Sequence, residues 1–280
     1  MLQNNFGPNE GPGNLICGID EAGRGCVIGP LIIAAAVWKR TEYDQLASLG
    51  VRDSKEYTSE KEKKERISLA DKIRSKAHKT CISEIPPREI DEAIHSFRTA
   101  KNLDPRAYAK ENLNILEINR MAELIITNPC HVYYIDSLSK PKYFLKRLEK
   151  TMMALYSDRI SGFSFEFESN IATITWLDAF SEQRSKIIAE NKADAKFPVV
   201  SAASIIAKVY RDTQIRLIEE KYGLPRDILS TGYANDTLMP FFQQYRKEIS
   251  KRVIFPFIRY EWRWRPLMDI ISRQMSLLDF

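Results

Sequence analysis

The sequence is poor in the residues that build cysteine- and histidine-based sites. Its 280 residues include only 4 cysteines and 3 histidines. No two cysteines have C-x-x-C spacing, and the histidines are scattered along the chain. These absences argue against a zinc site and against a disulfide framework. We therefore interpret the cysteines as isolated thiols of a protein that works in a reducing interior.

Long apolar runs are also lacking. No stretch approaches the roughly 20 apolar residues that a membrane-spanning helix needs. Residues 1–14 are rich in Gly, Pro and Asn, and they lack the apolar and basic regions of a secretory signal. We expect a flexible tail at 1–14, no membrane partner and a cytoplasmic location.

The composition otherwise suits a globular protein with a substantial core. Hydrophobic residues make up 44% and charged residues 28%, and the formal net charge is a mild +5. Residues 243–265 contain seven Lys and Arg, two Glu and six aromatic residues. Two interpretations of this stretch stay open: an additional contact with duplex nucleic acid, or a helix pair with core aromatics and solvated charges.

Hydrophobic periodicity predicts an α/β protein. Strands are predicted at 15–20, 30–38, 79–85, 131–136, 163–169 and 171–177, and residues 186–195 are predicted to be a strand that runs into a loop. Helices are predicted at 59–78, 88–96, 105–128, 141–155 and 198–223. Hairpin strands interspersed with crossover helices predict a mixed sheet flanked by helices. We expect one domain at 15–223, a smaller helical subdomain at 224–270 and a tail at 271–280.

Acidic residues occur where three predicted strands end. Asp20 and Glu21 close the first, Asp136 closes another, and Asp194 follows a third. Carboxyl ends of parallel strands meet at one edge of a sheet, so these acids could converge. Clustered carboxylates need cations, and oxygen-only ligands favour Mg²⁺ or Mn²⁺. Two such ions support phosphodiester cleavage. The alternative is that the acids are ordinary surface or capping residues.

Five segments, taken in chain order, resemble the motifs of type 2 ribonuclease H, also called ribonuclease HII. They are GIDEAGRGCVIGPLIIAAAV (18–37), DSK (53–55), YYIDS (133–137), KADAKFPVVSAASIIAKVYRD (192–212) and STGYANDTL (230–238). The first and fourth are highly specific, whereas DSK alone is not. The residues of the fourth segment and the chain length resemble those of the archaeal or eukaryotic branch more than those of the bacterial branch.

The resemblance implies a ribonuclease H-like fold with a small C-terminal helical subdomain. It implies hydrolysis of the RNA strand of RNA–DNA hybrids, and cleavage at ribonucleotides embedded in duplex DNA, leaving 5′-phosphate and 3′-hydroxyl ends. Two divalent ions, Mg²⁺ or Mn²⁺, would be the cofactors. The implied catalytic and metal-binding acids are Asp20, Glu21, Asp136 and Asp194.

The same resemblance implies a substrate-reading turn. The main chain of Gly23, Arg24 and Gly25 would read the ribose 2′-OH, which distinguishes RNA from DNA. Glycines allow a backbone to approach a ligand closely. Tyr233 would stack on a sugar at the RNA–DNA junction. The alternatives are a plain tight turn and a core tyrosine.

Basic residues are further candidates for contacts with the substrate. Lys55 and Lys192, together with Arg24, are candidate phosphate contacts, although any single lysine could simply be solvated.

The tyrosine motif of the family usually has prolines where this chain has Ala234 and Thr237. Their loss should loosen that loop.

The C-terminal residues suggest a partner. Gln274, Leu277 and Phe280 follow the Q-x-x-L-x-x-F spacing of a sliding-clamp-binding peptide. The alternative is a helix end folded back on the body of the protein. We otherwise expect a monomer, because no long accessory region is present.

Three function hypotheses follow from these observations. The first is an active type 2 ribonuclease H, the second a catalytically silent hybrid-binding subunit associated with the clamp, and the third a metal nuclease acting on DNA junctions. The complete set of four acids favours the first over the second. The ribose-reading turn favours the first over the third.

Overall fold

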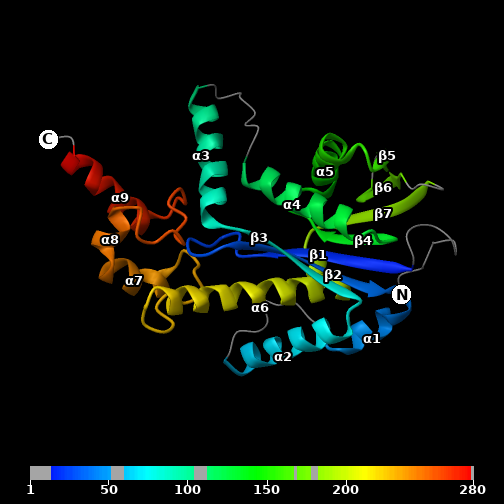
Figure 1. The fold of residues 1–280 in the computed structure, drawn as a ribbon, viewed down its shortest axis with the longest axis horizontal. Helices are drawn as coiled ribbons and strands as arrows, with labels where there is room; N and C mark the ends of the chain where they lie inside the picture. The colour runs from blue at the N-terminus through cyan, green and yellow to red at the C-terminus, as the bar shows by residue number, and fades with distance from the viewer. Residues whose placement is uncertain (1–13, 52–59, 104–111, 167–168, 178–181, 279–280) are drawn as a thin grey trace. The chain divides into compact units, whose positions relative to one another are not determined.

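The structure is a computed structural model that describes residues 14–51, 60–103, 112–166, 169–177 and 182–278 (Figure 1). The chain divides into two compact units. Unit 1 comprises Met1–Glu21, Ile33–Ser83 and Glu117–Val209. Unit 2 comprises Ala22–Ile32, Glu84–Leu116 and Tyr210–Phe280. The domain bounds expected from the sequence remain a prediction.

A seven-stranded sheet has the order β3-β2-β1-β4-β7-β6-β5. Its strands are β1 (Leu15–Ala22), β2 (Leu31–Lys39), β3 (Lys79–Ile85), β4 (Val132–Asp136), β5 (Ile160–Phe165), β6 (Ile171–Trp176) and β7 (Gln183–Glu190). The β1–β4 and β4–β7 pairs are parallel, whereas β5–β6 and β6–β7 are antiparallel. The predicted mixed α/β sheet is therefore confirmed.

The helices account for much of the remaining described chain. They are α1 (Tyr43–Ser48), α2 (Glu60–Lys76), α3 (Pro87–Leu103), α4 (Leu113–Thr127), α5 (Pro141–Tyr156), α6 (Pro198–Lys221), α7 (Met239–Gln244), α8 (Arg246–Ser250) and α9 (Arg265–Leu278). Within unit 1, α5 lies on one face of the sheet and the first turns of α6 lie on the other (Figure 1). None of the helices in the described ranges is long and apolar enough to cross a membrane.

Burial on both faces explains the apolar sequence of the central strands. In β2 every residue except the terminal lysine is buried, as expected for a strand covered on both sides. Gly18 of β1 shows how closely α6 approaches. A Cβ at Gly18 would lie only 2.0 Å from the carbonyl oxygen of Val199. The absence of a side chain at position 18 thus permits the contact between strand and helix.

Several element boundaries differ from the sequence-based expectation. Strand β1 continues to Ala22, so the first two acids lie within the strand. Strand β7 stops at Glu190, because the chain turns at Lys192, whose φ is +57°. Helix α4 begins at Leu113 rather than 105, and Asn112 caps it by accepting a hydrogen bond from the amide of Ile115 at 3.1 Å. Part of that predicted helix, 104–111, lies outside the described residues.

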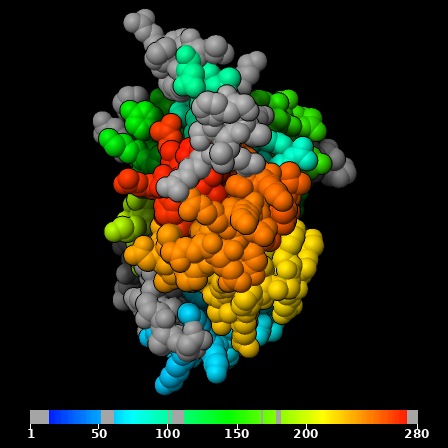
Figure 2. Space-filling view, turned by 90° about the vertical axis from the view of Figure 1, so that its left-hand side faces the viewer, coloured from blue at the N-terminus to red at the C-terminus, as the bar shows by residue number. Residues whose placement is uncertain are grey.

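Unit 2 has its own core, which contains most of the C-terminal aromatic residues. Phe241, Phe242, Phe255 and Phe257 are buried there, and the aromatic rings at 245, 260, 262 and 264 pack against this core. The aromatic residues of 243–265 are therefore packing residues, as one of the two open interpretations proposed. Figure 2 shows the surface that the segment around α7 and α8 presents, in orange.

Candidate active site

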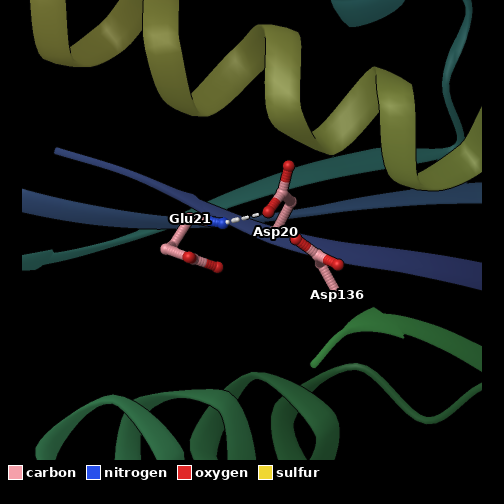
Figure 3. Close-up of side chains that lie close together, drawn as sticks. All are labelled: Asp20, Glu21 and Asp136. Carbon is pink, nitrogen blue, oxygen red and sulfur yellow. Dashed lines mark hydrogen bonds between the residues drawn. The ribbon is translucent and has the colours of Figure 1, made fainter. Parts of the chain in front are cut away.

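The parallel register of β1 and β4 aligns two of the predicted acids. Ile19 is paired with Ile135, and the next residue on each strand is an aspartate, Asp20 and Asp136. Asp20, Asp136 and Glu21 each offer a carboxylate oxygen, and these oxygens all lie within 4.8 Å of one another (Figure 3). The structure therefore brings together three of the four acids that the sequence singled out.

The electrostatics of this cluster oppose full ionisation. Asp20 is 3% exposed. Burial raises the pKa of Asp20 well above its usual value, and the charges of Glu21 and Asp136 raise it further, while a hydrogen bond with Ser204 lowers it. The Oδ1 atom of Asp20 also accepts a hydrogen bond from the amide of Glu21 at 2.8 Å. A bound cation would offset the repulsion among these carboxylates.

Asp194 lies on a short 3₁₀ turn, Ala193–Ala195, and not at a strand end. It is buried, and it lies near enough to Asp20 to contribute to the raised pKa of that residue. Two contacts fix its turn: the Ala193 amide donates to Oδ1 of Asp136 at 2.9 Å, and the Ser201 hydroxyl donates to the Asp194 carbonyl. Its carboxylate is not among the three within 4.8 Å. Its role as a ligand remains a prediction.

A fifth acid at the same sheet edge has a different role. Glu190 of β7 is aligned with Asp136 in the parallel register. Its two carboxylate oxygens accept hydrogen bonds from the Lys196 ammonium at 2.7 Å and from the Asn170 amide at 2.8 Å. The charge of Glu190 is therefore balanced by Lys196, and its two hydrogen bonds hold Asn170 and Lys196 next to the end of β7.

Within unit 2, the predicted substrate-reading turn adjoins the predicted junction tyrosine. Cys26 and Tyr233 form an antiparallel bridge, and the carbonyl of Gly232 accepts hydrogen bonds from the amides of Val27 and Ile28. A Cβ at Gly25 would lie 3.5 Å from the ring of Tyr233. Tyr233 is 40% exposed, so its ring can reach a ligand. The alternative of a buried core tyrosine is thus wrong.

Two features of this turn had no signal in the sequence. The guanidinium of Arg24 donates a hydrogen bond to the side-chain oxygen of Asn114. Arg259 is fully buried and donates to the carbonyl of Gly29 at 3.0 Å and to that of Arg24 at 3.1 Å. An arginine in a basic stretch is ordinarily expected on the surface. The burial of Arg259 depends on these hydrogen bonds to the segment 24–29, which is distant in the sequence.

The remaining predicted contacts are only partly described. Lys192 is exposed, as a phosphate contact would be, and its role remains a prediction. Lys55 lies outside the described residues. In the clamp-like tail, Gln274 and Leu277 belong to α9 by their backbone, but their side chains, and all of Phe280, fall outside the described part of the chain.

Comparisons with known proteins agree on one family. The family profile of ribonuclease HII matches residues 17–264. Ribonuclease HII of Archaeoglobus fulgidus is 33% identical over 94% of this chain and 98% of its own length. Ribonuclease HII of Methanocaldococcus jannaschii is 34% identical over 94% of this chain and 99% of its own length.

Solved structures show the same relationship. Ribonuclease H2 from Pyrococcus horikoshii matches with a TM-score of 0.64 and 27% identity, covering 92% of this chain and 98% of that chain. The ribonuclease HII in a complex with PCNA from Archaeoglobus fulgidus matches with a TM-score of 0.61 and 28% identity, covering 89% and 95%. A Bst ribonuclease HIII solved with Mn²⁺ shares the fold at 18% identity, with a TM-score of 0.57 and coverage of 93% and 71%.

Proposed function

We propose that this chain, which belongs to the ribonuclease HII family and hydrolyses the RNA strand of RNA–DNA hybrids, also cuts at single ribonucleotides in duplex DNA. We further propose a two-metal-ion mechanism that leaves 5′-phosphate and 3′-hydroxyl ends. The observation that carries the mechanism is the convergence of three carboxylates within 4.8 Å.

The donor set of the cluster fits divalent ions. Asp20, Glu21 and Asp136 present only carboxylate oxygens, which are the ligands that Mg²⁺ and Mn²⁺ prefer. We propose that these residues, with Asp194, hold two such ions. When bound, the ions would activate the attacking water and stabilise the leaving oxygen. The chain's own contribution is to fix the carboxylates at the edge of a rigid sheet.

Substrate selection is proposed to depend on unit 2. The Gly23–Gly25 turn begins two residues after Glu21, and Tyr233 adjoins that turn. Gly23 has a φ of +91°, a backbone conformation that strongly favours glycine. We propose that this turn reads the ribose 2′-OH through its backbone and that Tyr233 stacks on the neighbouring sugar.

Cleavage of two labelled duplexes tests the proposal. One is a DNA duplex with a single embedded ribonucleotide, and the other carries a continuous RNA strand. Wild-type protein with Mg²⁺ or Mn²⁺ should cut both, and Asp136→Asn should cut neither. Asp158→Asn is the matched control, because Asp158 is an exposed acid of unit 1 outside the cluster.

Each other outcome has a distinct meaning. Cutting of the continuous hybrid alone would overturn the assigned role of Tyr233 and leave the metal cluster intact. Cutting of neither duplex by folded wild-type protein would favour a silent or partner-dependent subunit. Cutting of a DNA-only junction would favour the third hypothesis.

We also propose that the C-terminal tail binds a sliding clamp. The supporting observations are the spacing of Gln274, Leu277 and Phe280, and the similarity to a ribonuclease HII that was solved in a complex with PCNA. A short apolar peptide of this kind would place its Leu and Phe together in a pocket of the partner.

A further inference from the structure

Arg211 is a buried cation next to the predicted substrate-reading residues, and the mechanism above does not use it. It lies on the part of α6 that belongs to unit 2, and it is 3% exposed. A side chain so buried cannot serve as a phosphate contact at the surface. Burying a guanidinium is costly unless it is paired and hydrogen-bonded. Its contacts should therefore indicate what it stabilises.

Those contacts reach the segment that carries Tyr233. The Nη2 atom of Arg211 donates a hydrogen bond to the carbonyl of Thr231, two residues before Tyr233. The guanidinium carbon lies 5.0 Å from the centroid of the Tyr233 ring, within the range of a cation–π interaction. The charge is balanced by Asp212, whose Oδ1 is 3.4 Å from Nη1.

Two glycines leave the space that Arg211 occupies. A Cβ at Gly23 would lie 2.9 Å from both Cδ and Nε of Arg211. A Cβ at Gly232 would lie 3.0 Å from Nη2. The φ values of these glycines are +91° and +69°, so both positions also favour glycine for backbone reasons. The arginine side chain thus passes between the turn that carries Gly23 and the turn that carries Tyr233.

We propose that Arg211 is a positioning residue that holds the Tyr233 ring in register with the Gly23–Gly25 turn, and thereby sets the preference for single ribonucleotides. This inference rests on the proposed function of Tyr233. Because Tyr233 is 40% exposed, its orientation depends on the contacts that the rest of its side chain makes within the protein. Arg211 supplies a contact to the ring and another to the backbone that precedes it.

The choice of arginine follows from this double contact. A planar guanidinium can lie against an aromatic ring while an N–H group donates to a carbonyl. Lysine keeps the charge but cannot reproduce that planar geometry. Arg211→Lys therefore isolates the geometry from the charge, and it leaves Asp212 with a cation nearby.

The test measures kcat/KM on the single-ribonucleotide duplex and on the continuous hybrid. We expect Arg211→Lys to lower kcat/KM on the single-ribonucleotide duplex, relative to kcat/KM on the continuous hybrid, by about tenfold, because an ammonium cannot lie flat against the ring while it donates to the Thr231 carbonyl. Arg98→Lys is the matched control, because Arg98 pairs with Glu261 in unit 2 and contacts neither turn in the described structure. The control should keep the wild-type ratio.

Double variants decide whether Arg211 acts through the ring of Tyr233. In a Tyr233→Phe background the ring remains, and Arg211→Lys should still lower the ratio about tenfold. In a Tyr233→Leu background the ring is absent, and Arg211→Lys should change the ratio by less than about twofold. Equal effects in the two backgrounds would overturn the inference, because Arg211 would then act independently of the ring.

A second measurement needs no Arg211 variant to fold. In protein labelled with ¹⁵N-arginine, Tyr233→Leu should shift the Arg211 side-chain resonance and speed its exchange with water. An unchanged resonance would overturn the inference. A wild-type enzyme that cuts the continuous hybrid but not the single-ribonucleotide duplex would instead refute the proposed function, whatever the Arg211 variants do.

Discussion

Gly18 of β1 and Val199 of α6 approach so closely that a single methyl group would not fit between them. A Cβ at position 18 would lie 2.0 Å from the carbonyl oxygen of Val199 and 2.6 Å from the amide nitrogen of Val200. Both obstacles are backbone atoms, which cannot move aside as a flexible side chain could. The contact joins the strand that carries Asp20 to the helix that follows Asp194, so it bears on stability and on the site.

Gly18→Ala should therefore be severely destabilising. Overpacking of a core typically costs about 1–3 kcal/mol, and we expect this variant to lose about 3 kcal/mol of unfolding free energy. Urea denaturation monitored by circular dichroism would measure the loss. Gly162→Ala is the control, because a Cβ there would lie 3.7 Å from the Thr175 side chain, an ordinary contact. Equal stability of the two variants would contradict the prediction.

Asp136→Asn should separate activity from stability. Loss of a metal ligand should lower cleavage at least about 100-fold, since outer-shell partners alone often account for 10–100-fold. Without divalent ions, the variant should be at least as stable as wild type, because one repelling charge leaves the cluster while the oxygen that accepts from Ala193 can remain.

Thermal unfolding with and without divalent ions would test the expected stability of Asp136→Asn. Mg²⁺ or Mn²⁺ at about 100 times its Kd should stabilise wild-type protein by about 2.7 kcal/mol, and chelation should remove the effect. Asp136→Asn should show a smaller gain. An equal gain would mean that the ions bind elsewhere.

Arg259→Met should weaken unit 2 and the substrate-reading turn together. The variant would leave the carbonyls of Gly29 and Arg24 without the buried guanidinium that donates to them. We expect a loss of about 3 kcal/mol in unfolding free energy, measured in urea. Arg98→Met is the comparison, because its ion pair is partly exposed and should contribute about 1 kcal/mol or less.

Asp91 should make unfolding depend on pH. Burial raises its pKa to about 6, although its carboxylate accepts hydrogen bonds from the amides of Tyr260 and Glu261. Its pKa in an unfolded chain is about 3.9, so between these values the folded state binds more protons. The contribution of Asp91 to stability is therefore greatest below about pH 4 and declines as the pH rises to about 6.

The difference between wild type and Asp91→Asn isolates this effect from the other carboxyl groups. The unfolding free energy of wild type should fall relative to that of the variant as the pH rises from 4 to 6. Urea titrations at several pH values would measure it. A constant difference over that range would show that Asp91 has an ordinary pKa.

Removal of the tail should weaken clamp binding without impairing the chemistry. A protein truncated after residue 273, and the point variant Phe280→Ala, should each bind an archaeal or eukaryotic sliding clamp at least about tenfold more weakly, because hot-spot aromatics contribute at least 2 kcal/mol. Pull-down with the purified clamp would measure this. Equal binding of the full-length and truncated proteins would exclude the tail as the docking peptide.

The sequence by itself determined the local features of this protein. Apolar runs that end in acid located the strands of Asp20 and Asp136, because a strand buried on both faces must be almost wholly apolar. The residues of the motifs and their order along the chain predicted the family, which the comparisons confirm. Boundaries were less secure: α4 begins at Leu113 because Asn112 caps it, a detail that periodicity does not record.

Only the tertiary structure decided which residues meet. Asp20 and Asp136 converge because β1 and β4 are parallel and Ile19 is paired with Ile135, and a shift of one residue would place the side chains on opposite faces. The burial of Arg211 and Arg259 likewise depends on turns from distant segments. Periodicity along a chain reports how each side chain faces the interior, whereas register and packing between segments determine its partners.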